Sequence, residues 1–321
     1  MDSRDLGTAS LPVSVIGLGC NNLGRAGTRT ETAEGAAAVV HAALDAGITL
    51  LDTADVYGRE FGLSETLLGE ALRGRDLEGV VIATKFGHRD LAPRDLAGDA
   101  PMGSRAYIRA AVEGSLTRLG IETIDLYQHH TPDPATPVEE TLAALDELVQ
   151  EGKIRHIGSS NYDAAQLRAA DAAAVAAGTT RFVSAQNEYN LLKRDAEHDA
   201  LQASEELGLG FLPWFPLANG LFTGKFSRTE RPADSRIARQ RPHIADEAPW
   251  DAMEAFAAFC AERSIGMLEA TVGWFLSHPA LASVIAGATS PEQVRQNAAA
   301  GDGWRPDAAE RAAIDAMFPL G

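Results

Sequence analysis

The feature of the sequence that most constrains its fold is a regular alternation of short apolar runs with longer helical ones. Eight strand-like runs fall at 13–18, 48–52, 80–85, 124–129, 153–158, 182–187, 210–215 and 282–286. Helix-like runs lie between most of them, at 32–46, 64–73, 104–119, 137–151, 163–176 and 194–207. This alternation predicts right-handed βαβ units and a parallel sheet, and eight repeats favour a closed (β/α)8 TIM barrel over an open doubly wound sheet.

The whole chain, 1–321, is predicted to form one barrel domain, since 321 residues is an ordinary length for this fold and no linker interrupts them. The regular spacing breaks after the seventh strand, where residues 216–248 are rich in Arg, Pro and Gly. A segment of this length is predicted to be a functional loop. Two helical runs, 249–264 and 267–277, precede the eighth strand, and another near 307–317 lies in the tail.

Composition narrows the class of protein. The chain has 28 Lys and Arg against 45 Asp and Glu, so its formal net charge is −17. Nucleic acids and anionic membranes require a basic surface, and we expect neither as a partner. No apolar run reaches the 18 or so residues of a membrane span, and the polar start has no signal-peptide pattern. With only Cys20 and Cys260, a disulfide framework is excluded and cytoplasmic residence is the expectation.

Three consecutive predicted strands end in polar residues. Asp52 ends the second apolar run, Lys85 ends the third, and His129 and His130 close the fourth, while Tyr57 follows Asp52 in the next loop. The carboxyl ends of parallel strands meet at one face of a barrel, which is where such folds build their active sites. A carboxylate there needs a partner, because an isolated buried charge is costly. We therefore expect Asp52 to pair with Lys85.

These motifs closely resemble the aldo-keto reductase family. The matching stretches are LDTADVYG, ATKFG, DLYQHHTPD, GKIRHIGSSN, AQNEYNLL and GATSPEQVRQN, in family order between residues 51 and 297. The resemblance implies a TIM barrel closed at its floor by an N-terminal hairpin. It also implies a reductase that uses a nicotinamide cofactor to reduce a small-molecule carbonyl substrate, an aldehyde or ketone, to an alcohol.

The resemblance assigns catalytic roles to Asp52, Tyr57, Lys85 and His130. Tyr57 is the implied proton donor, and a free phenol has a pKa of about 10, too high for efficient donation near neutrality. A nearby cation lowers the pKa of a phenol, and Lys85, held and kept protonated by Asp52, supplies that charge. His130 is implied to hydrogen-bond the carbonyl oxygen and orient the substrate.

The two adjacent histidines require a choice. The catalytic histidine of the family stands five residues after the Asp of DLY, which here is Asp125, and this spacing selects His130. Neighbouring side chains on a strand point to opposite faces, so one histidine should face the barrel mouth and the other should not. We expect His129 to pack on the exterior, under a helix.

The resemblance places the nicotinamide cofactor along the later strands. Ser160, Asn161 and Gln186 are expected at the carboxamide, Trp214 beneath the ring, and Asn297 at the adenine. The other residues expected at the cofactor, from the loop over the pyrophosphate and from the segment after the last strand, are Pro216, Leu217, Gly220, Leu221, Thr223, Gly224, Lys225, Gly287, Thr289 and Gln293.

Local structure alone accounts for some of these residues. Ser160 and Asn161 suit a helix cap, while Ser290, Pro291 and Gln293 suit an N-cap, a first helical position and a capping box. The same helix start would also receive the adenosine 2′-phosphate, so we expect NADPH rather than NADH. Many relatives have Lys or Arg at Gly287, Thr289 or Gln293, and their absence here predicts a weaker preference for NADPH.

Other chemistries have less support in the sequence. The segment after the first strand lacks the glycine pattern of a Rossmann fold, and no Cys or His cluster has zinc spacing. A Schiff-base enzyme would use Lys85 as nucleophile, but its predicted carboxylate partner keeps it charged. A non-catalytic redox sensor on the same fold stays an alternative. The oligomeric state is open, and loops decide the substrate. Pocket residues are proposed at Asn21, Asn22, Phe86, His88 and Trp304.

Overall fold

The computed structural model describes residues 1–93, 95–233 and 235–320. Its strands are β1 (Ser3–Asp5), β2 (Pro12–Ser14), β3 (Ile16–Gly19), β4 (Leu50–Asp52), β5 (Val81–Phe86), β6 (Leu96–Asp99), β7 (Ile124–His129), β8 (Ile154–Ser160), β9 (Phe182–Glu188), β10 (Gly210–Trp214) and β11 (Val284–Gly287). Its α-helices are α1 (Ala33–Asp45), α2 (Leu63–Leu72), α3 (Arg105–Leu119), α4 (Val138–Gln150), α5 (Ala164–Ala177), α6 (Ala200–Leu207), α7 (Arg236–Gln240), α8 (His243–Asp246), α9 (Trp250–Glu262), α10 (Met267–Leu276), α11 (Pro291–Gly301) and α12 (Ala308–Met317). Short 3-10 helices are η1 (Cys20–Asn22), η2 (Arg29–Glu31), η3 (Asp195–His198) and η4 (Ala218–Thr223).

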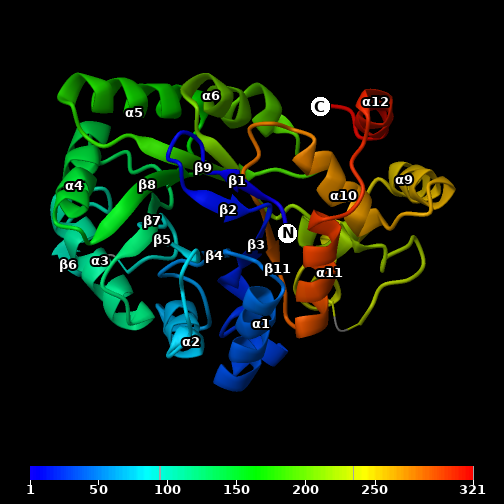
Figure 1. The fold of residues 1–321 in the computed structure, drawn as a ribbon, viewed down its shortest axis with the longest axis horizontal. Helices are drawn as coiled ribbons and strands as arrows, with labels where there is room; N and C mark the ends of the chain where they lie inside the picture. Colours follow the sequence, from blue (N-terminus) through cyan, green and yellow to red (C-terminus); the bar gives the residue numbers. More distant parts are fainter. Residues whose placement is uncertain (94, 234, 321) are drawn as a thin grey trace.

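Eight strands form one parallel sheet that curves into a nearly closed barrel. Their order is β10-β9-β8-β7-β5-β4-β3-β11, and each pairs in parallel with the next, as β3 does with β4 and β5 with β7. A parallel bridge between Phe211 and Leu281 brings the two ends of the sheet together. Helices α1 to α6 follow one another around its outside (Figure 1). The predicted eight-stranded α/β barrel is therefore confirmed.

The N-terminal hairpin is present, as the family resemblance implied. Strands β1 and β2 pair antiparallel, with Ser3 opposite Ser14. The hairpin turn is packed tightly against the start of β10: Gly7 has a φ of 61°, and a Cβ there would lie 2.5 Å from the carbonyl oxygen of Gly208. The single strand predicted at 13–18 is in fact two strands, β2 of the hairpin and β3 of the barrel, which are separated at Val15. The Val15 amide donates to the backbone oxygen of Asp2, next to β1 of the hairpin.

Alternation along each strand separates an interior from an exterior. The small core inside the barrel contains Leu50, Ala83 and Leu126, whereas Phe86 and Tyr127 belong to the larger core between strands and helices. Because successive side chains of a strand point to opposite faces, residues two positions beyond the interior ones also face inward. This parity places Asp52, Lys85 and Gln128 at the carboxyl end of the barrel interior.

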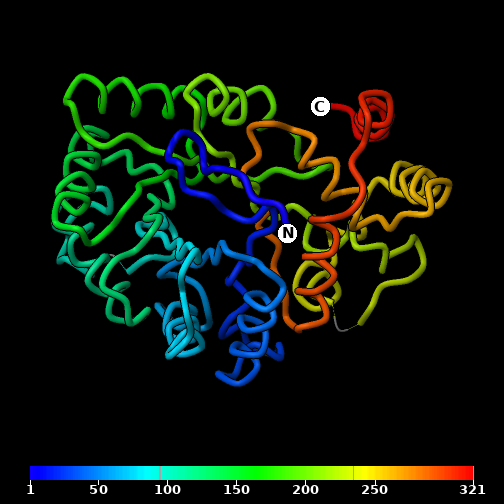
Figure 2. Tube along the Cα trace, in the orientation of Figure 1, coloured from blue at the N-terminus to red at the C-terminus, as the bar shows by residue number. Residues whose placement is uncertain are grey.

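The long segment after β10 contains more regular structure than a single functional loop. It includes η4, α7 and α8, although the sequence predicted a functional loop there without helices. The tube in Figure 2 runs from η4 to α9 on the same side of the molecule as α10 and α11. Among the described residues, none of the helices has both the length and the apolar character needed to cross a lipid bilayer.

Candidate active site

A buried ion pair lies at the carboxyl ends of β4 and β5. The ammonium of Lys85 donates to Asp52 Oδ2 at 2.7 Å and to the backbone oxygen of Thr53 at 2.8 Å. The other carboxylate oxygen of Asp52 accepts from the side-chain amides of Gln186, at 2.9 Å, and Gln128, at 3.3 Å. The Asp52 side chain is 4% exposed and that of Lys85 is fully buried. The expected pairing is confirmed, and the two glutamines complete the hydrogen bonding of the carboxylate.

Lys85 is held in its charged form. Burial acts to lower its pKa, but the charges of Asp52 and Tyr57 and hydrogen bonds with both residues outweigh burial and leave the pKa above its usual value. Its ammonium lies 5.1 Å from the centre of the Tyr57 ring. A protonated lysine at this distance is the cation that the sequence predicted beside the phenol.

Tyr57 responds to two opposing influences. Burial of its hydroxyl raises the pKa, the charge of Lys85 lowers it, and a hydrogen bond with Lys85 lowers it further; the net pKa lies above that of a free phenol. The effect of Lys85 has the expected sign, but the expectation that the pKa falls overall is wrong in this structure, because burial is the larger influence. The phenol is therefore protonated at neutral pH, the form that donates a proton.

The two histidines at the end of β7 point in opposite directions. The His130 ring meets the Tyr57 ring edge to face at 5.8 Å. The His129 ring instead stacks on Phe86 at 4.9 Å, and its Nδ1 shares a hydrogen bond of 2.8 Å with the hydroxyl of Tyr162. The structure therefore brings His130 to the ion pair and the phenol, and packs His129 on the exterior of the barrel.

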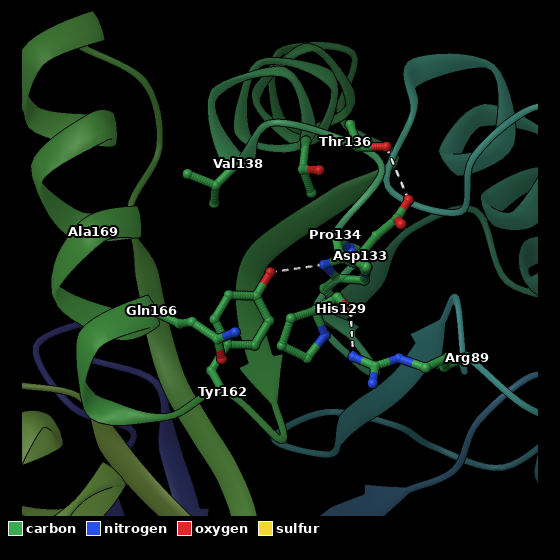
Figure 3. A pocket seen from close by; sticks show the side chains of 11 residues that line it. Arg89, His129, Asp133, Pro134, Thr136, Val138, Tyr162, Gln166 and Ala169 are labelled. Atoms are coloured by element: carbon green, nitrogen blue, oxygen red, sulfur yellow. Dashed lines mark hydrogen bonds between the residues drawn. The ribbon is translucent and has the colours of Figure 1, made fainter.

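His129 lines a separate cavity of about 220 Å³. Figure 3 shows this cavity between the start of α4, α5 and the segment that follows β7, with His129 bonded to Tyr162. Its lining residues are Arg89, His129, Pro132, Asp133, Pro134, Thr136, Val138, Thr141, Tyr162, Gln166 and Ala169, and His130 is not one of them. Burial lowers the pKa of His129 to about 4, so its imidazole is neutral at physiological pH.

His130 is neutral as well. Burial lowers its pKa well below the usual value, and the positive charge of Lys85 adds to this effect. Its Nδ1 is buried with no hydrogen-bond partner among the described residues. A buried N–H without an acceptor is costly, so this arrangement favours the tautomer that carries its proton on Nε2.

Three amide and hydroxyl side chains gather at the ends of β8 and β9. Asn161 donates to the backbone oxygen of His130 at 2.9 Å and to Ser160 Oγ at 3.1 Å, and its backbone amide donates to Gln186 at 3.0 Å. Asn161 has a left-handed φ of 61°. The alternative reading of Ser160 and Asn161 as helix caps is wrong, because α5 is capped by Asp163 with Gln166.

The chain after β10 has an unusual backbone. Trp214 is partly exposed at the strand end, and Phe215, Ala218 and Asn219 have left-handed φ values of 53°, 44° and 61°. Such angles cost a non-glycine residue roughly 1–3 kcal/mol each, and they cluster at functional sites. Ala218, Asn219 and Gly220 have positive φ values in succession, within the loop that the sequence placed over the pyrophosphate. Further along, Gly224 and Lys225 are exposed, whereas Pro216, Leu217 and Leu221 are buried.

The helix after β11 begins as predicted, with one change. Ser290 caps α11 by accepting from the Gln293 amide at 3.3 Å. The Gln293 side chain does not return to Ser290, as a capping box requires; it accepts from the Thr289 amide at 2.7 Å and from the Thr289 hydroxyl at 3.1 Å. Two of the N–H groups at this end are thus already bonded, and Pro291 has none. Asn297 is buried on the same helix.

Some site residues were placed wrongly or missed. Phe86 is fully buried outside the barrel, and Trp304 packs on Phe259, so neither faces the ion pair. His88 does approach His130, with ring centres 4.6 Å apart. Gln128 was missed. It stands two residues before His130, so the alternation along the strand places its side chain on the same, inward face and would have indicated it.

A second buried carboxyl group lies directly behind the site. Asp55 is fully buried, and neither of its carboxyl oxygens has a hydrogen-bond partner among the described residues. Burial raises its pKa well above the usual value, and the negative charge of Glu65 raises it further, against the opposing charges of Arg118 and Lys85. Nothing in the sequence distinguished Asp55 from an ordinary loop acid.

The comparisons with known proteins agree with this geometry. A parallel barrel with an acid, a phenol, a lysine and a histidine gathered at its strand ends is the architecture of a barrel oxidoreductase. The sequence pattern of the aldo/keto reductase family matches residues 15–318. An uncharacterized oxidoreductase of Bacillus subtilis (strain 168), YrpG, is 37% identical over 302 residues, which make up 92% of this chain and 89% of YrpG.

The chain belongs to the aldo/keto reductase family and is an oxidoreductase of that family. Members of this family generally use NAD(P)H. Within the described residues, no group of three or more Cys, His, Asp and Glu side chains is arranged to hold a metal ion.

Proposed function

We propose that the protein reduces aldehydes or ketones to alcohols with NADPH, and that Tyr57 donates the proton. The observation that carries this proposal is the contact of Tyr57 with both Lys85 and His130. A proton donor, a fixed cation and a neutral hydrogen-bond donor at one place suit a carbonyl oxygen that gains negative charge as it is reduced. The reduced nicotinamide, when bound, supplies the hydride to the carbonyl carbon.

The residues of the chain act on the carbonyl oxygen. Tyr57 gives its hydroxyl proton to that oxygen, while Nε2–H of His130 donates a hydrogen bond to it and orients the substrate. Lys85 stabilises the phenolate that forms, and Asp52 keeps Lys85 charged and in place. The raised pKa of Lys85 supports this role. It also opposes a Schiff-base enzyme, because a protonated amine is not a nucleophile.

The residues proposed for the cofactor fit a dinucleotide. Ser160, Asn161 and Gln186 offer hydrogen bonds suited to a carboxamide, and the flat ring of Trp214 is partly exposed for stacking. The left-handed backbone of η4 suits a pyrophosphate, and Asn219 Oδ1, buried without a partner among the described residues, lies in that segment. Lys225 adds an exposed cation. The segment from Gly287 to Asn297 would take the adenosine.

The proposal is tested by following NADPH oxidation with a panel of aldehydes and ketones. Steady consumption of NADPH with formation of the alcohol supports it. Binding of NADPH, measured by quenching of tryptophan fluorescence, together with no turnover of any carbonyl would contradict it and favour a sensor. NADH, assayed in parallel, measures the cofactor preference.

A further inference from the structure

The cavity that His129 lines lies outside the barrel, between the end of β7, the start of α4 and α5 (Figure 3). Two of its lining residues, His129 and Tyr162, are buried. Three others, Pro134, Gln166 and Ala169, are exposed, so the cavity opens to solvent on their side. Its volume is about 220 Å³, and a cavity of roughly 150 Å³ is large enough to hold benzene. A molecule the size of one ring can therefore enter it.

The hydrogen bond between His129 and Tyr162 fixes the position of two protons. The His129 ring is neutral, because burial lowers its pKa to about 4, and so it carries a single N–H. Its Nε2 is buried with no partner among the described residues, against Gly87, where a Cβ would lie 3.4 Å from it. An N–H left unbonded there would cost more than an unbonded acceptor. The proton therefore belongs on Nδ1, which donates to the Tyr162 oxygen at 2.8 Å.

Tyr162 consequently has a hydroxyl hydrogen left to donate. Its oxygen accepts from His129, and within the part of the chain that the structure describes no residue accepts the O–H in turn. Burial raises the pKa of Tyr162, so the phenol keeps this hydrogen at neutral pH. Figure 3 shows the hydroxyl among the side chains that line the cavity. A molecule in the cavity can supply the acceptor that the protein does not.

The other uncharged polar side chains of the lining add a donor rather than an acceptor. The hydroxyls of Thr136 and Thr141 already donate within the protein. Gln166 accepts the Asp163 amide with its side-chain oxygen at 3.0 Å. Its side-chain nitrogen has no partner among the described residues and remains a donor at the exposed side of the cavity. The cavity therefore suits a molecule that accepts hydrogen bonds.

The charges in the lining cancel. Burial acts to raise the pKa of Asp133, but hydrogen bonds from two backbone amides and from Thr136 outweigh burial and lower the pKa, so this carboxylate is ionised. Arg89, which donates to the backbone oxygen of Pro132 at 3.0 Å, carries the opposite charge. The imidazole of His129 is neutral. The lining therefore has no net charge to attract either an anion or a cation, and a neutral molecule suits it best.

We propose that this cavity binds a small neutral molecule that has a carbonyl or amide oxygen on an apolar body of about one ring. The oxygen accepts from the Tyr162 hydroxyl, and the body lies against apolar lining residues, among them Val138 and Ala169. His130 does not line this cavity, so the site is separate from the proposed active site and does not depend on the proposed reaction. Water, which can accept the same hydrogen bond, is the competing occupant.

The test is a ligand-observed NMR titration of the full chain with benzamide, benzoate and benzylamine, which share a shape and differ in charge. NADP⁺ is present throughout, so that benzamide does not compete for a nicotinamide site. Benzamide should bind with a Kd of about 1 mM or below, within reach of a ligand this small. The two charged probes should bind several-fold more weakly, because they lose their hydration without gaining a net opposite charge. No binding of benzamide, or a charged probe that binds as tightly, overturns the proposal.

Variants locate the binding. Ala169→Trp fills the cavity and should abolish binding of benzamide, whereas Val175→Trp, at a position of the same helix that is 62% exposed, should leave it unchanged. Ala169→Leu fills less and should weaken binding, which keeps the test available if the tryptophan prevents folding. Tyr162→Phe should raise the Kd about three- to tenfold, the scale of one hydrogen bond. Circular dichroism melting checks that each variant is folded. Unchanged affinity for benzamide in folded Ala169 variants, or in Tyr162→Phe, contradicts the assignment.

Discussion

Lys85 donates to the Asp52 carboxylate at 2.7 Å, directly above the apolar side chains that fill the barrel. A buried pair of this kind contributes little net stability, because both charges lose their hydration. Removing one partner is different, since the other charge is then buried alone. The position of the Asp52–Lys85 pair next to Tyr57 suggests a role at the active site, which explains the pair better than a contribution to stability does.

Lys85→Met should lower the free energy of unfolding by about 3–5 kcal/mol, because the Asp52 carboxylate loses its counter-charge. The double variant Asp52→Asn, Lys85→Met should recover part of this loss, since the amide carries no charge. Urea denaturation of both proteins measures the difference. Equal stability of the single and double variants would show that the two charges do not depend on each other.

Asp55 should make the protein less stable as the pH rises. Its pKa is raised in the folded state, so the folded carboxyl keeps its proton above pH 4 while the unfolded chain releases it, and the folded state loses stability from about pH 4 up to the folded pKa. Asp55→Asn removes this titration and keeps the shape. The unfolding free energy of the variant, relative to wild type, should therefore increase from pH 5 to pH 8.

Urea denaturation at both pH values measures this difference. Asp45→Asn, at an exposed position paired with Arg75, controls for the change in net charge. A difference between Asp55→Asn and wild type that stays constant or decreases as the pH rises contradicts the assignment of a protonated Asp55.

Much of the fold was predictable because it depends on local patterns. Apolar runs at regular spacing define the strands, and their parity explains why Asp52 meets Lys85. The same parity applied to β5 would have excluded Phe86, which directly follows Lys85 and so points outward. The burial of Asp55 was not predictable, because it depends on loop conformation and on contacts between distant segments that follow no periodicity.

Thr289→Arg should lower the dissociation constant of NADPH and change that of NADH little. The Thr289 backbone amide keeps its bond to Gln293 in this variant, so the helix start should survive. A new charged hydrogen bond to the 2′-phosphate contributes roughly 1.5–3 kcal/mol at best. Fluorescence titration with both cofactors measures the effect, and an equal gain for the two would show that the phosphate binds elsewhere.

His130→Ala should decrease kcat/KM for the carbonyl substrate, because the ring contacts Tyr57. His129→Ala should leave kcat/KM within a few-fold, but should lower the unfolding free energy by about 1–3 kcal/mol, since the buried Tyr162 hydroxyl loses its partner. Steady-state rates and denaturation of both variants separate the two roles. A large loss of kcat/KM in His129→Ala, together with normal kcat/KM in His130→Ala, would show that the two histidines have the opposite roles.

The most direct test of the mechanism is the steady-state rate of Tyr57→Phe. This variant loses one hydroxyl and retains the ring, so NADPH affinity and folding should hardly change. The rate of carbonyl reduction should fall about 10²–10⁴-fold, the usual effect of removing a general acid. Near-normal turnover of Tyr57→Phe, with NADPH bound as in the wild type, would contradict the assignment of Tyr57 as the proton donor.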